Sequence, residues 1–285
     1  MVTAPTVAGA GLEGGSGRRI RVLGHRGARA VRPENTIPAF EYAIAAGVDA
    51  LELDVAVTRD DVVVVSHDPT LHPPICHGGQ PGAVIRRLTL AEVRQWDCGA
   101  IRNPAFMRQE PVPGTPMPTL DQVLDLAPGG EFDFNIEVKS YPGRPDLTPP
   151  PGEFAGLVLE SVRQRRLEMR VVVQSFDFRI LEAMKRLAPE IRLAALYWGP
   201  PRDLAGIARE AGAGTVSPEQ SLVTPEQVLN AHRAGCEVVP WTANTPVEWD
   251  RLIASAVDGI ISDDPKALLE FLQQRGLRPH TLGSG

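Results

Sequence analysis

Short runs of β-branched and aliphatic residues alternate along this chain with stretches in which apolar residues recur at helical spacing. Eight runs predict strands, which we expect at residues 21–24, 50–57, 133–138, 171–174, 192–196, 214–217, 237–240 and 258–261. Eight stretches predict helices, which we expect at 37–46, 120–126, 154–165, 180–187, 203–211, 225–234, 246–255 and 266–273. This alternation predicts a parallel sheet, and roughly 250 residues suffice to close it into a (β/α)8 TIM barrel.

Local signals support several of these boundaries. Thr224-Pro225 and Thr245-Pro246 each place a capping hydroxyl before a proline in the first helical position. The main alternative is an open, doubly wound sheet, which normally carries a glycine-rich phosphate turn after its first strand. No G-x-G-x-x-G follows the strand expected at 21–24. The pattern therefore favours the closed barrel.

Two segments interrupt the alternation. Residues 69–118 are rich in proline and glycine, and a structureless loop of that length is unusual inside a compact domain. We therefore expect an insertion after the second strand that caps the barrel mouth. Residues 141–152 contain five prolines and predict a stiff exposed loop. Residues 20–275 are then one barrel domain, with flexible tails at 1–19 and 276–285.

Composition narrows the functional classes. A formal net charge of -6 is atypical of nucleic-acid-binding proteins, which usually carry a basic stripe, so we expect no nucleic-acid partner. No run of about 18 apolar residues is present, so we expect no membrane span. The N-terminus lacks the charged start and the Leu-rich run of a signal peptide.

The three cysteines are Cys76, Cys98 and Cys236. They are far apart, odd in number and form no C-x-x-C pair, so we expect neither a disulfide framework nor a structural zinc site. This usage is typical of a reducing compartment, and we expect a cytoplasmic protein.

Carboxylates gather where two of the predicted strands end. Glu52 and Asp54 lie two residues apart near the end of the second strand, so both point to one face. Glu137 closes the third strand. Because active sites of such barrels lie at the carboxyl ends of the strands, the three side chains should converge. An all-oxygen set of this kind predicts one divalent cation, Mg²⁺ or Ca²⁺.

Two histidines should flank the same place. His25 follows the first strand directly. A polar turn around Asp60 predicts a hairpin in which paired residue numbers sum to about 120, and this pairing returns His67 to the level of Asp54. Two imidazoles that titrate near neutrality are suited to general acid and base catalysis. The other histidines lack a strand-end or carboxylate context and are expected to be structural or exposed: His72, His77, His232 and His280.

Arg26 and Lys139 add positive charge at the same strand ends. The arginine fork matches phosphate oxygens, and lysine supplies a point charge. A cation with two histidines, an arginine and a lysine is suited to a reaction that develops negative charge on an anionic substrate. Phosphodiester cleavage is such a reaction.

At these residues the chain resembles the glycerophosphodiester phosphodiesterase family. The resemblance extends over about residues 21–270, and it rests on the following segments: His25-Arg26-Gly27, Pro33-Glu34-Asn35-Thr36, Ala39-Phe40, Glu52-Leu53-Asp54, Thr58, His67-Asp68, Glu137-Val138-Lys139, Gln174-Ser175-Phe176, Trp241-Thr242-Ala243-Asn244 and Asp258 to Pro265. One departure is Asp60-Asp61, where the family usually has Asp-Gly in the hairpin turn.

The resemblance implies a TIM barrel with an insertion after the second strand, and metal-dependent hydrolysis of small glycerophosphodiesters to glycerol 3-phosphate and an alcohol. It implies His25 and His67 as the acid–base pair, and a divalent cation on Glu52, Asp54 and Glu137. It further implies phosphate contacts from Arg26 and Lys139, with Glu34 and Asn35 in support. Trp241 and Trp198, both at strand ends, are candidates to line the pocket beside the glycerol or its alcohol.

Three other classes of protein fit the sequence less well. An enzyme acting on intact lipid would need an exposed apolar rim for membrane docking, which the insertion sequence shows little of. A metallo-amidohydrolase barrel would usually carry H-x-H on its first strand, whereas Arg26 and Gly27 follow His25. A non-catalytic phosphate-binding barrel would have no need of two histidines and three carboxylates.

Overall fold

The computed structural model describes residues 19–278. Within them, parallel strands form one sheet in the order β10-β9-β8-β7-β6-β2-β1-β11. Two backbone hydrogen bonds join its ends: Asp258 N donates to Val238 O at 2.9 Å, and Ile261 N donates to Pro240 O at 3.0 Å. The predicted TIM barrel is confirmed. The strands are β1 Arg21–Gly24, β2 Ala50–Val57, β6 Asp133–Val138, β7 Val171–Ser175, β8 Arg192–Tyr197, β9 Thr215–Pro218, β10 Glu237–Val238 and β11 Gly259–Ser262.

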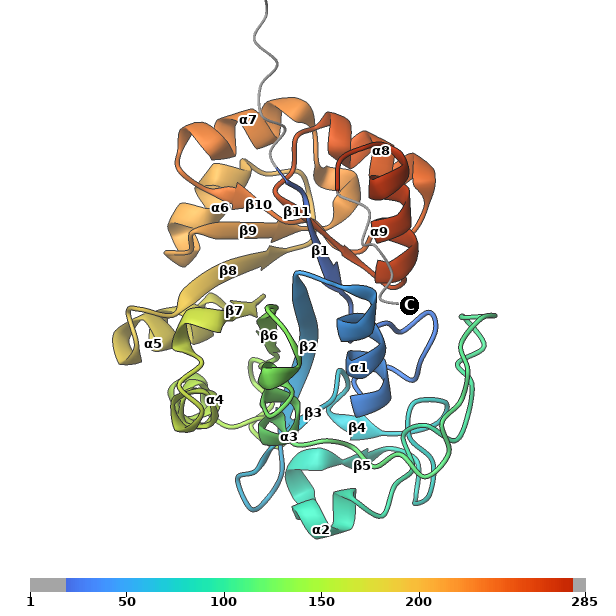
Figure 1. Ribbon diagram of the computed structural model, residues 1–285. Coiled ribbons are helices and arrows are strands. Elements are labelled where there is room, and N and C mark those ends of the chain that lie inside the picture. Colours follow the sequence, from blue (N-terminus) through green and yellow to red (C-terminus); the bar gives the residue numbers. More distant parts are fainter. Residues whose placement is uncertain (1–18, 279–285) are drawn as a thin grey trace, which may run out of the picture.

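Helices surround this sheet (Figure 1). They are α1 Ile37–Ala46, α3 Leu120–Leu124, α4 Pro151–Gln164, α5 Phe178–Leu187, α6 Leu204–Ala211, α7 Pro225–Arg233, α8 Pro246–Ala254 and α9 Pro265–Gln274. The hydroxyls of Thr224 and Thr245 cap α7 and α8 as expected. Helix α4 begins at Pro151, three residues before the predicted start, because a proline in the first helical position gives up only an N–H that has no intrahelical partner.

The apolar core has two parts that matter for the site. The main core lies between the strands and the helices, where Phe40, Phe134 and Phe154 are fully buried. A smaller cluster of Leu23, Ala50, Val239 and Ile261 is separate from it. Ala50 shares its face of β2 with Glu52 and Asp54, so this cluster fills the barrel interior beneath the carboxylates. Apolar side chains therefore pack directly beneath the carboxylates.

The hairpin after β2 has the predicted register. Strand β3 (Val63–Val65) pairs antiparallel with β2, and Val55 faces Val65, so paired numbers sum to 120. Ser66 N donates to Asp54 O at 2.9 Å, which brings the chain back to the level of the carboxylates. The following segment contains β4 (Thr70–Leu71), β5 (Ala83–Val84), the 3-10 turn η1 (Ile85–Arg87) and α2 (Leu90–Val93).

This segment extends from the barrel as a small subdomain, coloured cyan to green in Figure 1. Ala56 and Val64 of the hairpin pack with insertion residues in a core of their own, whose other members are Leu71, Cys76, Ile85, Val93, Trp96, Cys98 and Met117. Its capping box at Thr89 and Glu92 fixes the start of α2. The insertion is thus a folded unit attached to the outer edge of the hairpin.

The expectation of no disulfide is wrong. Cys76 and Cys98 are bonded, with an S–S distance of 2.05 Å. His77 and Asp97 exchange two backbone hydrogen bonds of 2.7 Å each, and this pairing brings the neighbouring cysteines together although 22 positions separate them. Cys236 is free and buried. Because two of the three cysteines are bonded, cysteine usage no longer indicates a reducing compartment.

None of the helices between residues 19 and 278 is long and apolar enough to cross a membrane. Most of the two expected tails, residues 1–18 and 279–285, lies outside the described residues, as does His280. At the C-terminal end, the buried side chain of Arg278 pairs with Asp49.

Candidate active site

A cavity of about 230 Å³ opens at the carboxyl ends of the barrel strands. It brings together seven of the residues singled out in the sequence: His25, Arg26, Glu52, His67, Glu137, Lys139 and Trp241. Glu34, Asn35 and Asp54 are buried and contact these residues from behind. The expected residues are therefore assembled in one place, and Trp198 is the exception.

The carboxylates of Glu52, Asp54 and Glu137 form one cluster. Asp54 on β2 is the register partner of Glu137 on β6, and Glu52 lies two residues earlier on the same strand. One oxygen from each lies within 4.8 Å of the others, and all three residues are buried. Gln174 fixes Glu52 by donating from Nε2 to Oε1 at 3.0 Å. Register and alternation thus place three acidic groups where water is largely excluded.

This crowding alters the protonation of the cluster. Burial and the charge of Asp54 raise the pKa of Glu137 to about 7. Burial, Asp54 and Glu137 likewise raise the pKa of Glu52 well above its usual range. Although burial opposes it, Lys139 and Arg26 hold the pKa of Asp54 well below its usual range. Additional positive charge at the cluster would therefore favour the ionised forms of Glu52 and Glu137 at neutral pH.

Two cations lie against the cluster. Lys139 Nζ is 3.0 Å from Glu137 Oε1 and 3.4 Å from Asp54 Oδ1, and these carboxylates raise the lysine pKa above its ordinary value against the effect of burial. Arg26 Nε is 3.3 Å from Asp54 Oδ2, and its NH1 donates to Glu34 at 2.6 Å. Both cations face the cavity with their charge fixed.

The turn after β1 holds Arg26 by an unusual backbone path. Arg26 has a φ of 49° and Gly27 a φ of 83°, and a Cβ on Gly27 would lie 2.7 Å from the backbone carbon of Ala39. Only glycine fits at 27, and left-handed geometry costs a non-glycine residue about 1 kcal/mol or more. This backbone path lets Arg26 N donate a hydrogen bond to Glu52 Oε2 at 2.9 Å. Glu34 then tethers the guanidinium and also pairs with Arg29 at 2.6 Å.

His25 is oriented by a chain of polar contacts. Its Nδ1 lies 2.5 Å from Asp263 Oδ1, and Asn244 Nδ2 donates to the other oxygen of Asp263 at 2.8 Å. Burial lowers the pKa of His25, and Asp263 opposes that shift. The second ring nitrogen, Nε2, is 3.9 Å from Glu52 and lies on the cavity side. Nε2 is therefore the atom available for proton transfer.

His67 has an analogous partner. Its Nδ1 lies 2.8 Å from Asp68 Oδ1, and Asp68 Oδ2 lies 2.9 Å from His72 Nε2. The expectation that His72 lacks a carboxylate partner is thus wrong, because β4 brings it back to Asp68. The same holds for His232, whose Nε2 lies 2.9 Å from Asp258 Oδ2, far from the cavity.

Aromatic side chains form one wall of the cavity. Trp241 lines it, donates from Nε1 to Ser217 O at 2.9 Å, and meets Phe176 edge-on with ring centroids 5.5 Å apart. Trp198 is 73% exposed and lines a neighbouring groove that Phe176 shares. Trp241 thus takes the expected place, whereas Trp198 lies beyond the rim.

The comparisons with known proteins agree with this geometry. A sequence model described as the glycerophosphoryl diester phosphodiesterase family matches residues 25–267. A glycerophosphodiester phosphodiesterase of Caldanaerobacter subterraneus subsp. tengcongensis is 31% identical over 259 residues, which cover 90% of this chain and 98% of that protein. The chain belongs to the glycerophosphoryl diester phosphodiesterase family.

Solved structures show the same fold. A Silicibacter pomeroyi protein assigned to glycerophosphoryl diester phosphodiesterases superposes with a TM-score of 0.83 at 34% identity, covering 90% of this chain and 94% of that one. An Oleispira antarctica phosphodiesterase, solved with the product sn-glycerol-3-phosphate, gives a TM-score of 0.77 at 23% identity, covering 89% and 96%. The resemblance found in the sequence is confirmed, and this family member is a phosphoric diester hydrolase.

The glycerophosphoryl diester phosphodiesterase family depends on a divalent metal, and the donor set here fits one. Glu52, Asp54 and Glu137 offer only oxygen ligands, which hard cations such as Mg²⁺ and Ca²⁺ prefer. Burial and mutual repulsion keep the pKa values of Glu52 and Glu137 raised, although Arg26 and Lys139 act to lower them. A cation bound by the three carboxylates would stabilise their ionised forms.

Several residues that shape the site had no role assigned from the sequence, although all but Arg29 lie in segments that carry the family resemblance. Asp263 and Asn244 hold His25, Gln174 holds Glu52, and Arg29 and Phe176 line the cavity. Asp263 and Gln174 lie at or just beyond strand ends, so the rule that located the carboxylates could have found both. Asn244 lies in an irregular segment, so the strand-end rule does not reach it, and only the family resemblance pointed to its segment.

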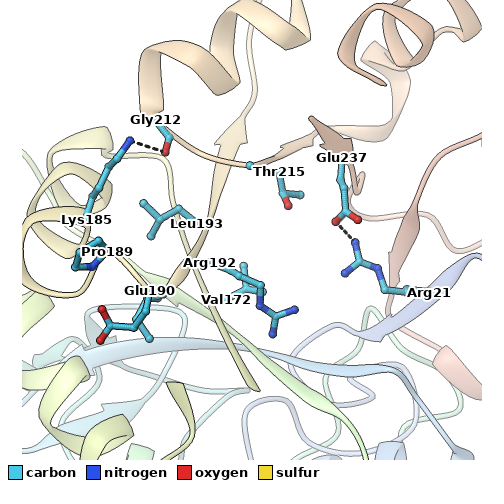
Figure 2. Close-up of a pocket in the computed structure, with 12 residues that line it drawn as sticks. Arg21, Val172, Lys185, Pro189, Glu190, Arg192, Leu193, Gly212, Thr215 and Glu237 are labelled. Atoms are coloured by element: carbon cyan, nitrogen blue, oxygen red, sulfur yellow. Dashed lines mark hydrogen bonds and ion pairs between the residues drawn. The ribbon is translucent and has the colours of Figure 1, made fainter. Parts of the chain in front are cut away.

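A larger cavity of about 440 Å³ lies at the opposite end of the barrel, at the amino ends of β8, β9 and β10. Figure 2 shows two interactions among the residues that line it: Arg21 pairs with Glu237, and Lys185 Nζ donates to the carbonyl oxygen of Gly212. Arg192 NH2 lies 2.8 Å from Asp133 Oδ2. Because catalysis in TIM barrels takes place at the carboxyl ends of the strands, the chemistry of this family member belongs to the smaller cavity.

Proposed function

We propose that this enzyme hydrolyses a glycerophosphodiester to glycerol 3-phosphate and an alcohol, with one divalent cation and with His25 and His67 as the acid–base pair. The observation that carries the proposal is the shared cavity. Two histidines, each with Nδ1 held by an aspartate, face a buried carboxylate cluster across one small space.

The cation would be held by Glu52, Asp54 and Glu137. When bound, it would neutralise negative charge that builds on the phosphoryl oxygens. Mg²⁺ and Ca²⁺ both suit an all-carboxylate set, so we propose one of these two ions.

Arg26 and Lys139 bind the phosphate in this proposal. The Arg26 guanidinium is tethered by Glu34 and its backbone by Glu52, so it donates to the phosphate from a fixed position. Asn35 supports the same place by donating from Nδ2 to Asp54 Oδ2 at 2.9 Å. Donors fixed in this way stabilise charge that develops in the transition state without reorganising.

The two histidines move protons at their Nε2 atoms. One accepts a proton from the attacking hydroxyl while the other donates a proton to the departing alcohol oxygen. Asp263 and Asp68 accept from the Nδ1 atoms, and this leaves each Nε2 directed to the cavity. The two roles require one neutral and one protonated ring at the start of each turnover.

The glycerol and alcohol portions lie against Trp241 and Phe176 in this proposal, since the two rings form the apolar wall. The groove of about 540 Å³ beyond Phe176 gives the alcohol a way out of the site. The Oleispira antarctica phosphodiesterase, with sn-glycerol-3-phosphate as its product, supports the choice of substrate class.

The test is a substrate panel of glycerophosphocholine, -ethanolamine, -glycerol and -inositol, assayed with chelator and after return of Mg²⁺ or Ca²⁺. Glycerol 3-phosphate should appear only with the cation present. Activity that persists in full in chelator would contradict the metal role of Glu52, Asp54 and Glu137.

A lipid substrate is the second candidate, because Trp198 is 73% exposed and lines the groove that adjoins the cavity at Phe176. Its ring could contact an acyl chain in that groove. Lysophosphatidylcholine added to the panel separates the two substrates. Hydrolysis of the lipid as fast as glycerophosphocholine would favour this second candidate.

A further inference from the structure

The hydrogen bonds of His72 determine its charge. His72 Nδ1 lies 3.1 Å from the carbonyl oxygen of Pro73, and a carbonyl can only accept. His72 Nε2 lies 2.9 Å from Asp68 Oδ2. The hydrogen bond from His67 is the main cause that lowers the pKa of Asp68 to about 2, so Asp68 is a carboxylate at neutral pH and also only accepts. Both ring nitrogens of His72 must then donate, which only an imidazolium can do.

The surroundings of His72 favour this charged form. The contacts with Pro73 and Asp68 raise the pKa of His72 above its ordinary value, and the charge of Glu34 adds to them. The side chain of His72 is about one-third exposed, so water also solvates the charged ring. The backbone oxygen of His72 also accepts from the N–H of Cys76 at 3.0 Å, which connects this residue to the disulfide-bonded insertion.

We propose that His72 is a positioning residue that acts on His67 through Asp68. The imidazolium of His72 holds one oxygen of Asp68, so that the other oxygen accepts the hydrogen bond from His67 Nδ1. The positive charge of His72 also offsets part of the charge of Asp68. His67 therefore keeps Nε2 directed to the cavity, and the negative charge that Asp68 presents to it is partly offset. His72 is not among the residues that line the cavity, so it acts on the reaction only through Asp68 and His67.

This arrangement is sensitive to pH. A neutral imidazole has a single N–H, so when His72 loses its proton either the Pro73 contact or the Asp68 contact loses its donor. Asp68 then presents its full charge to His67. The other titratable groups that line the cavity are His25, Arg26, Arg29, Glu52, Glu137 and Lys139, which lie on or just after barrel strands rather than on the insertion. Besides Asp68, the charge of Glu34 acts on His72.

The inference rests on the proposed role of His67, and its test has a readout that does not depend on turnover. In the metal-loaded enzyme, the pKa of His67 would be measured by NMR titration of labelled imidazoles. His72→Phe should raise that pKa, because the counter-charge on Asp68 is lost. Asp68→Asn should lower it, because the carboxylate itself is lost. His72→Lys, which restores a cation, should leave it near the value of the unmodified protein.

Turnover gives the second readout. His72→Phe should lower kcat about 10- to 100-fold, as removal of groups that orient functional histidines does, with little change in KM. His72→Lys should recover most of kcat. Titration curves of His67 that coincide in His72→Phe and the unmodified protein would overturn the inference, as would shifts of the same sign in His72→Phe and Asp68→Asn. A His67→Ala variant that turns over normally would instead contradict the proposed function.

Discussion

His25 and Asp263 are 238 positions apart in the chain, yet His25 Nδ1 and Asp263 Oδ1 are 2.5 Å apart. The contact exists because the barrel closes by pairing β1 with β11, which sets Gly24 opposite Ser262. Asp263 is held in turn by Asn244, whose Oδ1 accepts from the Asp263 N–H at 2.8 Å. One ring nitrogen of His25 is thereby fixed, and the other is left for chemistry.

Asp263→Asn should retain the fold and lower kcat by roughly 10- to 100-fold. The carboxylate counteracts the lowering of the His25 pKa by burial, so its removal should lower that pKa further. The limb of the pH–rate profile that belongs to His25 should move to lower pH. A profile with both limbs unmoved would contradict this role for Asp263.

His25→Ala and His67→Ala should each lose about 10²- to 10⁴-fold in turnover, the usual contribution of a general acid or base. The double variant should fall little below the worse single variant, because groups that act as a unit are not additive. The unmodified enzyme should show a bell-shaped pH profile that belongs to the coupled pair. His77→Ala, an exposed histidine of the insertion, is the matched control and should turn over normally.

Without metal, stability should fall as the pH rises. The pKa of Glu137 is raised from 4.5 to about 7, so its contribution to folding is complete below the pKa of an unfolded glutamate and is lost as the pH passes through about 7. Glu52 shifts in the same direction. A bound cation favours the ionised carboxylates and should oppose the loss.

The measurement is the thermal midpoint in chelator and in Mg²⁺ or Ca²⁺ between about pH 5 and 8. The gap between the two curves should widen with pH and reach at least about 3 °C, which is roughly 1 kcal/mol in a domain of this size. Glu137→Gln should flatten the dependence in chelator. A constant gap would count against these carboxylates as the ligands.

Removing the disulfide with Cys76→Ala and Cys98→Ala should destabilise the insertion by about 3 kcal/mol, since the bond closes a loop between positions 22 residues apart. Hydrogen exchange should accelerate in residues 69–118 before it accelerates in the barrel strands. Reductant should reproduce the effect in the unmodified protein and in Cys236→Ala, which keeps the bond. Exchange that speeds up equally everywhere would mean that insertion and barrel unfold together.

Local pattern was enough to predict the frame of the site. The alternation on β2 and its register with β6 depend on neighbouring residues, so the convergence of Glu52, Asp54 and Glu137 could be foreseen. The return of His67 followed from turn chemistry and the antiparallel pairing rule, and the observed pairing of Val55 with Val65 confirms that register.

Contacts between distant or irregular segments could not be predicted in the same way. The Cys76–Cys98 bond depends on a backbone bridge inside a segment without periodicity. His72 reaches Asp68 only because β4 and the turn after it place the ring beside the hairpin. In both cases the packing of the insertion core determines which residues meet. The conformational preferences of single residues do not predict that packing.

The insertion leaves and rejoins the barrel at almost the same point. Val64 on β3 forms a backbone bridge with Thr119, and Val65 N donates to Pro118 O at 2.9 Å, although about fifty residues lie between them. Such a segment can be lengthened, shortened or exchanged by recombination without altering the strand order that holds the carboxylates. It also carries His72, so a lineage that remodels this segment to suit a new substrate also changes the setting of His67. In such a lineage, substrate range and the setting of His67 would change together, while the strands that carry Glu52, Asp54 and Glu137 stay the same.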